Sequence, residues 1–165
     1  MKKLALSFTL VLLLVAGCFA QQGKVILKAG TIILAQLEVT IDVGDSNTGD
    51  DFSLTTTEEI NAEGAKIEKG TVLTGRILTL KKSANATDNS EVRLFFDFMK
   101  KGDSFMNLNA LIISVKRTDK PLEMKFTAAP NFPGATVISQ KGKNVRLEKG
   151  DVFQIKIQED LKTDN

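Results

Sequence analysis

The sequence predicts an all-β fold: a single antiparallel β-barrel or β-sandwich domain with at most one short helix, preceded by a signal peptide. Three observations support this prediction. Apolar and polar residues alternate with a period of two along several segments, which turns one face of each strand inward. Turn-forming glycines recur between those segments, as in folds built from many short strands. The chain also has 10 Phe and many β-branched residues, and such side chains suit pleated surfaces.

Residues 1–20 have the composition of an export signal. Lys2 and Lys3 precede an apolar run from Leu4 to Val15, and small residues follow, which is the order found in secretory signal peptides. The run is too short for a transmembrane helix, which needs about 20 apolar residues to cross the hydrocarbon core. We therefore expect an exported protein whose mature chain has no transmembrane helix.

Two cleavage sites fit the end of this signal. Residues 15–18, Val-Ala-Gly-Cys, match a bacterial lipobox, in which Cys18 would be acylated and become the first residue of the mature chain. Cleavage before Gln21 is the alternative, because Cys18-Phe19-Ala20 is also a small-residue site. The first predicts a lipid-anchored protein at the outer membrane, and the second a soluble periplasmic or secreted protein.

Residues 21–165 are predicted to form one domain. Removing the signal also removes Lys2 and Lys3, so 20 basic and 20 acidic side chains remain and the net charge falls to zero. The two signs are interspersed, and the chain contains no Trp or Tyr. Since nucleic-acid binding needs a basic face with aromatic platforms, we expect no nucleic-acid partner.

The main part of the domain, 24–116, contains most of the alternating segments. Residues 37–42 and 92–98 alternate between apolar and mainly polar positions, which predicts strands with one buried face. Residues 105–115 are largely apolar on both faces, which predicts a strand buried on both sides. The only candidate helix is Thr56 to Ala65, where Thr57 could cap a first turn that carries two glutamates.

The rest of the chain is predicted to be a loop followed by closing strands. The segment 117–141 holds all 3 prolines of the sequence and little alternation, so we expect a crossing loop or an edge-strand excursion. In 142–161 the alternation returns, with Phe153, Ile155 and Ile157 separated by polar residues.

An internal repeat links the start, middle and end of the domain. Each copy has a short apolar segment, a turn with Lys and Gly, a Thr or Asp, and then a β run; the copies begin at residues 23, 64 and 142. The turn glycines are Gly30, Gly70 and Gly150, and glycine adopts positive φ at little cost. Either these are three similar β-turns of one barrel, or they build one recurrent rim for a partner.

The order of these motifs resembles the C-terminal β domain of the TrbI/VirB-type scaffold family of conjugation and type IV secretion machines. The similar stretches are Ala29-Gly30-Thr31, Gly44-Asp45, Ile67-Glu68-Lys69-Gly70-Thr71, Gly75-Arg76, Val92 to Phe98 and Lys101-Gly102-Asp103. The resemblance covers about residues 24–116 and implies a β-barrel or sandwich in a standalone exported relative. The family's inner-membrane helix, proline-rich arm and apolar pore hairpin have no counterpart here, so a secretion channel is not implied.

The residue types present argue against most catalytic sites. Without histidine the chain cannot form a Ser-His-Asp or Cys-His arrangement, and structural zinc would lack nitrogen and sulfur ligands. The acidic loop at residues 42–51 could offer oxygen atoms to calcium, but its spacing differs from an EF-hand, and we expect a solvated loop. Glu58 and Glu59 are neighbours in sequence and are expected at a helix start. We expect no metal and no cofactor.

The sequence thus predicts a non-catalytic exported envelope protein that acts as a structural or protein-interaction β domain. Its partner would be an envelope protein or a second copy, with a lipid anchor if Cys18 is acylated. The alternative is a carrier whose barrel interior holds a small apolar molecule or lipid, since the many Phe, Ile, Leu and Val residues could line a cavity as well as fill one.

Overall fold

The computed structural model describes residues 25–62, 65–117 and 122–162, all in strands, turns and loops, with no helix among them. The signal segment 1–20, with Cys18 and both cleavage sites, lies outside the described residues. The strands are β1 Val25–Leu27, β2 Ile32–Leu37, β3 Ile41–Asp42, β4 Asp51–Thr56, β5 Ile60–Ala62, β6 Ala65–Ile67, β7 Val72–Lys81, β8 Asn89–Lys101, β9 Ser104–Asn107, β10 Ala110–Lys116, β11 Lys125–Ala128, β12 Ala135–Lys141, β13 Arg146–Leu147, β14 Val152–Ile157 and β15 Leu161–Lys162.

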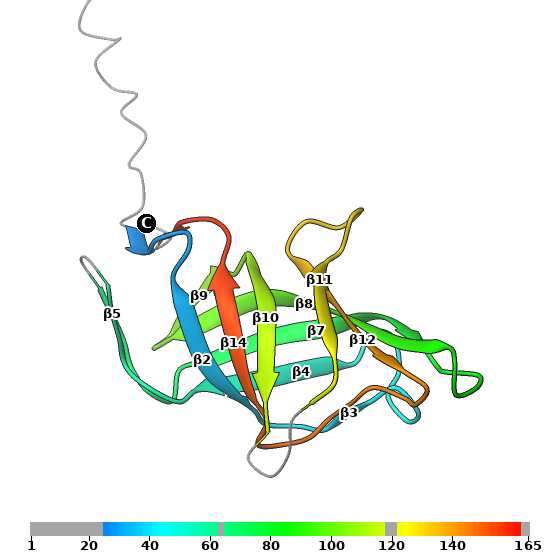
Figure 1. The fold of residues 1–165 in the computed structure, drawn as a ribbon. Helices are drawn as coiled ribbons and strands as arrows, with labels where there is room; N and C mark the ends of the chain where they lie inside the picture. The colour runs from blue at the N-terminus through cyan, green and yellow to red at the C-terminus, as the bar shows by residue number, and fades with distance from the viewer. Residues whose placement is uncertain (1–24, 63–64, 118–121, 163–165) are drawn as a thin grey trace, which may run out of the picture.

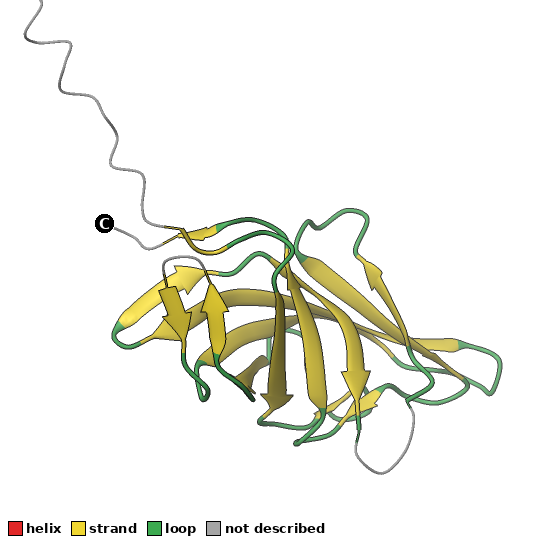
Figure 2. Cartoon of the chain, turned by 60° about the vertical axis from the view of Figure 1, so that its left-hand side comes forward, coloured by secondary structure: helices red, strands yellow, loops and turns green. Residues whose placement is uncertain are grey.

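The main sheet curls into a nearly closed antiparallel barrel (Figure 1). Its strand order is β10-β14-β2-β4-β7-β8-β12-β11, and β9 pairs with the far half of β8. The all-β prediction is therefore confirmed. Figure 2 shows the strands wrapping around one interior, with loops at both ends.

The barrel closes where its first and last strands, β10 and β11, lie side by side. No backbone ladder joins these two strands in the described chain. Instead the backbone N–H of Ile112 on β10 donates a hydrogen bond to the buried hydroxyl of Thr136 on β12, over 2.9 Å. Thr136 satisfies a donor that would otherwise be buried without a partner, which would be costly.

Three two-stranded sheets at the barrel ends repeat one arrangement. In each, a short strand, a glycine turn and a long strand follow one another along the chain. A second long strand pairs with the first one in the main sheet, and a second short strand follows it. The two short strands pair with each other. The short pairs are β1 with β15, β13 with β3, and β6 with β5. The internal repeat of the sequence therefore corresponds to three equivalent corners of the barrel.

The three glycine turns also share one hydrogen-bonding pattern. Each glycine has positive φ, at 88°, 89° and 98° for Gly30, Gly70 and Gly150. The glycine N–H donates to the carbonyl of one residue on the neighbouring strand. The N–H of that residue donates back to the carbonyl of the residue that follows the glycine. The glycine–neighbour pairs are Gly30–Ile157, Gly70–Thr56 and Gly150–Leu37, at 2.8, 2.9 and 2.8 Å. Each turn thus extends a ladder by one reciprocal pair of bonds.

The inward faces of the strands fill the barrel with one continuous apolar core. Phe52, Phe96 and Phe153 are its largest fully buried side chains, and the Phe52 and Phe96 rings meet edge to face with centroids 5.6 Å apart. Inward residues alternate with outward ones along β2 and β14 and along β8 as far as Asp97, as the period-two pattern predicts. The pattern fails at Phe98, which is not buried, and Met99 is buried instead.

The predicted helix over Thr56–Ala65 is wrong. β4 continues to Thr56, and a bend leads into the β5–β6 hairpin. The N–H of Thr56 bonds the carbonyl of Thr71, and the Thr56 carbonyl accepts from Gly70. These bonds, and that of the Thr57 N–H to the Leu34 carbonyl, hold the segment in the sheet, so Thr57 follows a strand end and caps no helix.

Three other segments differ from the sequence-based prediction. Residues 37–42 do not form one strand with a buried face: β2 ends at Leu37, Val39 is 43% exposed, and the chain bends before β3 pairs with β13. Residues 105–115 do not form one strand buried on both sides. β9 pairs with β8, and the N–H of Leu108 still bonds the Asp97 carbonyl of β8, whereas β10 pairs with β14. Phe105 and Ile113 are 54% and 43% exposed. The segment 117–141, expected to be a loop or edge excursion, contains the edge strand β11 and also β12, which is paired on both sides by β8 and β11. Its Pro130 and Pro133 lie in the connection between these strands, where no ladder donor is needed.

Candidate functional site

The acidic loop after β3 directs its carboxylates to its own backbone and to an arginine. Asp42 accepts from the N–H of Gly44 over 2.8 Å and from Nη1 of Arg146 over 2.6 Å. Asp50 accepts from the N–H of Asn47 over 2.7 Å. No group of three or more potential acidic, His or Cys ligands gathers within the described ranges. The loop thus uses these oxygens to fix its own shape.

Of the two glutamates at the predicted helix start, Glu59 forms an ion pair. Lys66 on β6 lies 2.6 Å from the carboxylate of Glu59, and that hydrogen bond lowers the pKa of Glu59 below its usual value. A general acid needs the opposite shift. Glu59 and Lys66 are both well exposed, so the pair acts as a link across the β5–β6 hairpin.

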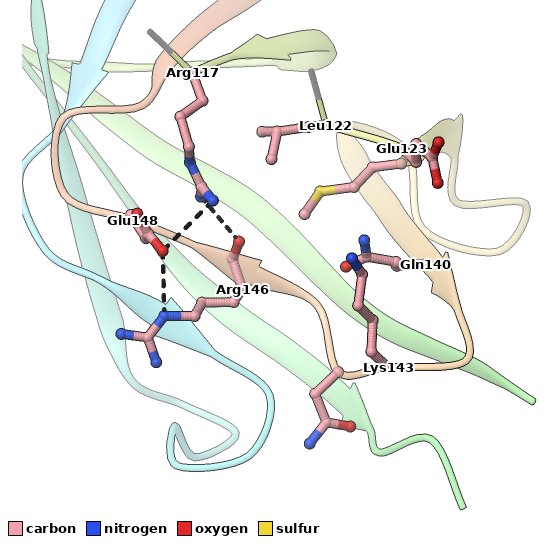
Figure 3. A pocket seen from close by; sticks show the side chains of 9 residues that line it. Arg117, Leu122, Glu123, Gln140, Lys143, Arg146 and Glu148 are labelled. Atoms are coloured by element: carbon pink, nitrogen blue, oxygen red, sulfur yellow. Dashed lines mark hydrogen bonds and ion pairs between the residues drawn. The ribbon is translucent and has the colours of Figure 1, made fainter. Parts of the chain in front are cut away.

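A polar cleft of about 380 Å³ lies beside the end of β10 (Figure 3). Arg117 reaches into it and donates from Nε and Nη2 to the buried carboxylate of Asp151, both over 2.7 Å. Glu148 lies 3.4 Å from Nη1 of Arg117 and 3.5 Å from Nε of Arg146. These ions therefore form a network that ties β10 to the third glycine turn.

A second cleft of about 350 Å³ opens where β9 and β12 separate along β8. Nδ2 of Asn109 donates to Glu159 over 2.8 Å, and Asp160 accepts from the N–H of Ala29 over 2.9 Å. Asp97 binds Arg76 on β7, and this hydrogen bond raises the pKa of Arg76. The charged groups of this cleft thus hold neighbouring segments together.

Aromatic side chains gather outside the barrel on β8 and its neighbours. The rings of Phe98 and Phe105 meet edge to face with centroids 5.0 Å apart, and Nζ of Lys100 lies 5.7 Å from the Phe105 centroid. Phe95 and Phe132 form a second edge-to-face pair at 5.2 Å. Phe105 is 54% exposed and Phe132 41%, so both rings are accessible to a partner.

Aliphatic side chains cover a different outer face, formed by β2, β14 and β10. Ile32 and Ile113 are 42% and 43% exposed there, and Leu34 and Leu111 are half-buried beside them. We call this the aliphatic face. The apolar residues at both odd and even positions of 105–115 led to a predicted strand buried on both sides, whereas the outer side of β10 is partly exposed. The outer residues of β10 join those of β2 and β14 in one face only because of the strand order, which the alternation of residues does not specify.

The predicted turn glycines do not all lie at the same end of the barrel. Gly30 docks against Ile157 at the end of β14, whereas Gly150 docks against Leu37 at the end of β2. Because β2 and β14 are antiparallel, these two turns lie at opposite ends of the pair. The three turns therefore do not assemble into one rim.

Comparison with protein-family models, with characterised proteins and with solved structures found no match to this chain. The resemblance to the TrbI/VirB-type scaffold domain stays a prediction from the sequence. The described residues include no helix with the length and apolar character needed to cross a membrane.

Proposed function

We propose that this domain is a non-catalytic structural or protein-interaction module of the cell envelope, which binds through its outer surface. The observation that carries the proposal is the filled barrel. Phe52, Phe96 and Phe153 are at most 2% exposed and belong to the single core cluster, packed as protein interiors usually are. A ligand held inside would have to displace these side chains.

The surface supports the same proposal. In the first cleft Arg117, Arg146 and Glu148 are bonded within the domain, and in the second cleft Asp97, Glu159 and Asp160 are, so internal bonds hold the walls of both clefts. The exposed large apolar residues, in contrast, lie on outer strand faces and loops: Ile32, Val39, Phe105, Ile113 and Phe132. Exposed apolar clusters on a folded domain favour protein or membrane contact. Export, as the signal segment predicts, would put this surface in the envelope.

Lipid extraction separates this proposal from the carrier alternative. The protein is purified without detergent from the periplasmic fraction and extracted with chloroform and methanol, and the extract is quantified by mass spectrometry. We expect the extract to contain far less than one molecule of any lipid class per protein chain. The same extraction on Phe105→Ser controls for lipid adhering to the aromatic surface. One equivalent of a single lipid class that survives Phe105→Ser would place the lipid inside the barrel and contradict the proposal.

A further inference from the structure

The aliphatic face extends over three adjacent strands in defined register. Outward residues align across β10, β14 and β2 through antiparallel pairings, with one bulge in the β10–β14 ladder between Ile112 and Ser114. The rows are Leu111–Lys156–Ile32, Ser114–Gln154–Leu34 and Lys116–Val152–Gln36, with Ile113 in the bulge of β10. Apolar side chains thus occupy at least one position in every row, and the two most exposed, Ile32 and Ile113, lie on the outer strands.

The charged side chains on the three strands of this face are all basic. None of the residues of β2, β10 and β14 is acidic, and the charged ones are Lys116 and Lys156. The outer face of β7 and β8 is different: Arg76 is bound by Asp97 there, and Lys81 lies opposite Glu91. A partner covering the aliphatic face would remove water from Lys156, whose row neighbours are Leu111 and Ile32, and an uncompensated charge under an interface is unfavourable.

We infer that the aliphatic face binds an amphipathic segment of a partner protein in which Asp or Glu residues flank apolar side chains. The apolar residues would cover Ile32, Leu34 and Ile113, and the carboxylates would meet Lys156 and Lys116. This inference rests on the proposed function and specifies its partner. Complementary charges of this kind select partners and orient their approach.

Two other occupants fit the face less well. A second copy docked face to face about a two-fold axis would add two more lysines and no carboxylate from these strands, and an interface with charges of one sign is disfavoured. A bilayer would cover Oε1 of Gln36 and Nε2 of Gln154 with hydrocarbon, which offers no hydrogen-bond partners; only the other atom of each amide bonds within the described part of the domain, to Gly150 and Ser114. A protein segment can supply both carboxylates and hydrogen bonds.

Site-specific photo-crosslinking in the protein's own cells tests this inference. A photoreactive phenylalanine analogue replaces Ile113, with Thr79 on the outer face of β7 as the negative control and Phe105 as a separate arm. We expect a protein crosslink at position 113 and none at 79, with the crosslinked peptide holding Asp or Glu beside apolar residues. Lys156→Glu should lower the yield at 113 by about fivefold, whereas Lys141→Glu, at the exposed end of β12, should leave it unchanged.

The other outcomes overturn the inference in distinguishable ways. A crosslink at 113 to lipid, to a second copy or to a segment without carboxylates rejects the stated partner chemistry. Equal yields in Lys156→Glu and in the unsubstituted chain reject the role of charge. A protein crosslink at 105 with none at 113 rejects the aliphatic face but keeps the proposed function. No protein crosslink at either position contradicts both.

Discussion

Replacing Gly75 with alanine is expected to destabilise the domain by about 3 kcal/mol, because overpacking of a rigid core forces backbone shifts. Gly75 lies in the middle of β7, opposite Phe52 and Phe96. A Cβ at this position would lie 2.3 Å from the carbonyl oxygen of Phe95 and 2.6 Å from Cζ of Phe52. The ring could move, but the carbonyl belongs to the barrel backbone. Urea denaturation followed by circular dichroism measures the loss.

Two further variants make the Gly75 prediction specific. Thr74→Ala changes the neighbouring outward position and should cost no more than about 0.5 kcal/mol, as is usual at surfaces. Adding Phe52→Leu to Gly75→Ala removes the ring contact and should restore only a part of the stability, since the backbone contact stays. A Gly75→Ala protein as stable as the parent would show that β7 and β8 are not packed this closely.

Arg117→Met is expected to cost about 3 kcal/mol, because it leaves the carboxylate of Asp151 buried without its cation. Asp151 is 2% exposed and accepts two bonds from Arg117 and a third from the N–H of Glu148. The equivalent position in the other two turns is threonine, at Thr31 and Thr71. Thr71 bonds back to the carbonyl of Glu68 over 2.7 Å without any arginine.

Because the three glycine turns are equivalent, a second substitution is expected to restore the stability that Arg117→Met loses. In the double variant Arg117→Met with Asp151→Thr, the third turn takes the residue of the other two, and no charge is left buried. We expect the double variant to recover most of the stability that Arg117→Met loses, as measured by urea denaturation in a double-mutant cycle. A double variant less stable than Arg117→Met would show that the three turns are not interchangeable.

Alternation predicted the strand faces because each strand's inside and outside follow from its own residues. Val92, Leu94 and Phe96 are buried as their spacing requires, and so are Phe153 and Ile155. Val39 and Phe98 are not buried, because the strand ends before the first and the alternation of β8 shifts before the second. The repeated glycine turns could likewise be located from the sequence, since positive φ is a local demand that glycine meets.

Features that depend on distant pairing could not be predicted in this way. Thr57 and the glutamates after it are typical of a helix start. The backbone bonds of Thr56 to Gly70 and Thr71 nevertheless keep this segment at the end of a strand. The aliphatic face exists because β14 lies between β10 and β2, and no residue of β2 near position 32 indicates what will lie beside it.

The central claim, that the outer surface of a filled barrel binds a protein, is tested most directly by native mass spectrometry of the protein from a membrane-plus-periplasm fraction of its own cells. We predict a ligand-free chain in a discrete non-covalent complex with another protein or with itself. The mass of the released chain also reports whether it begins at an acylated Cys18 or at Gln21. A chain found only as a free monomer would contradict the account.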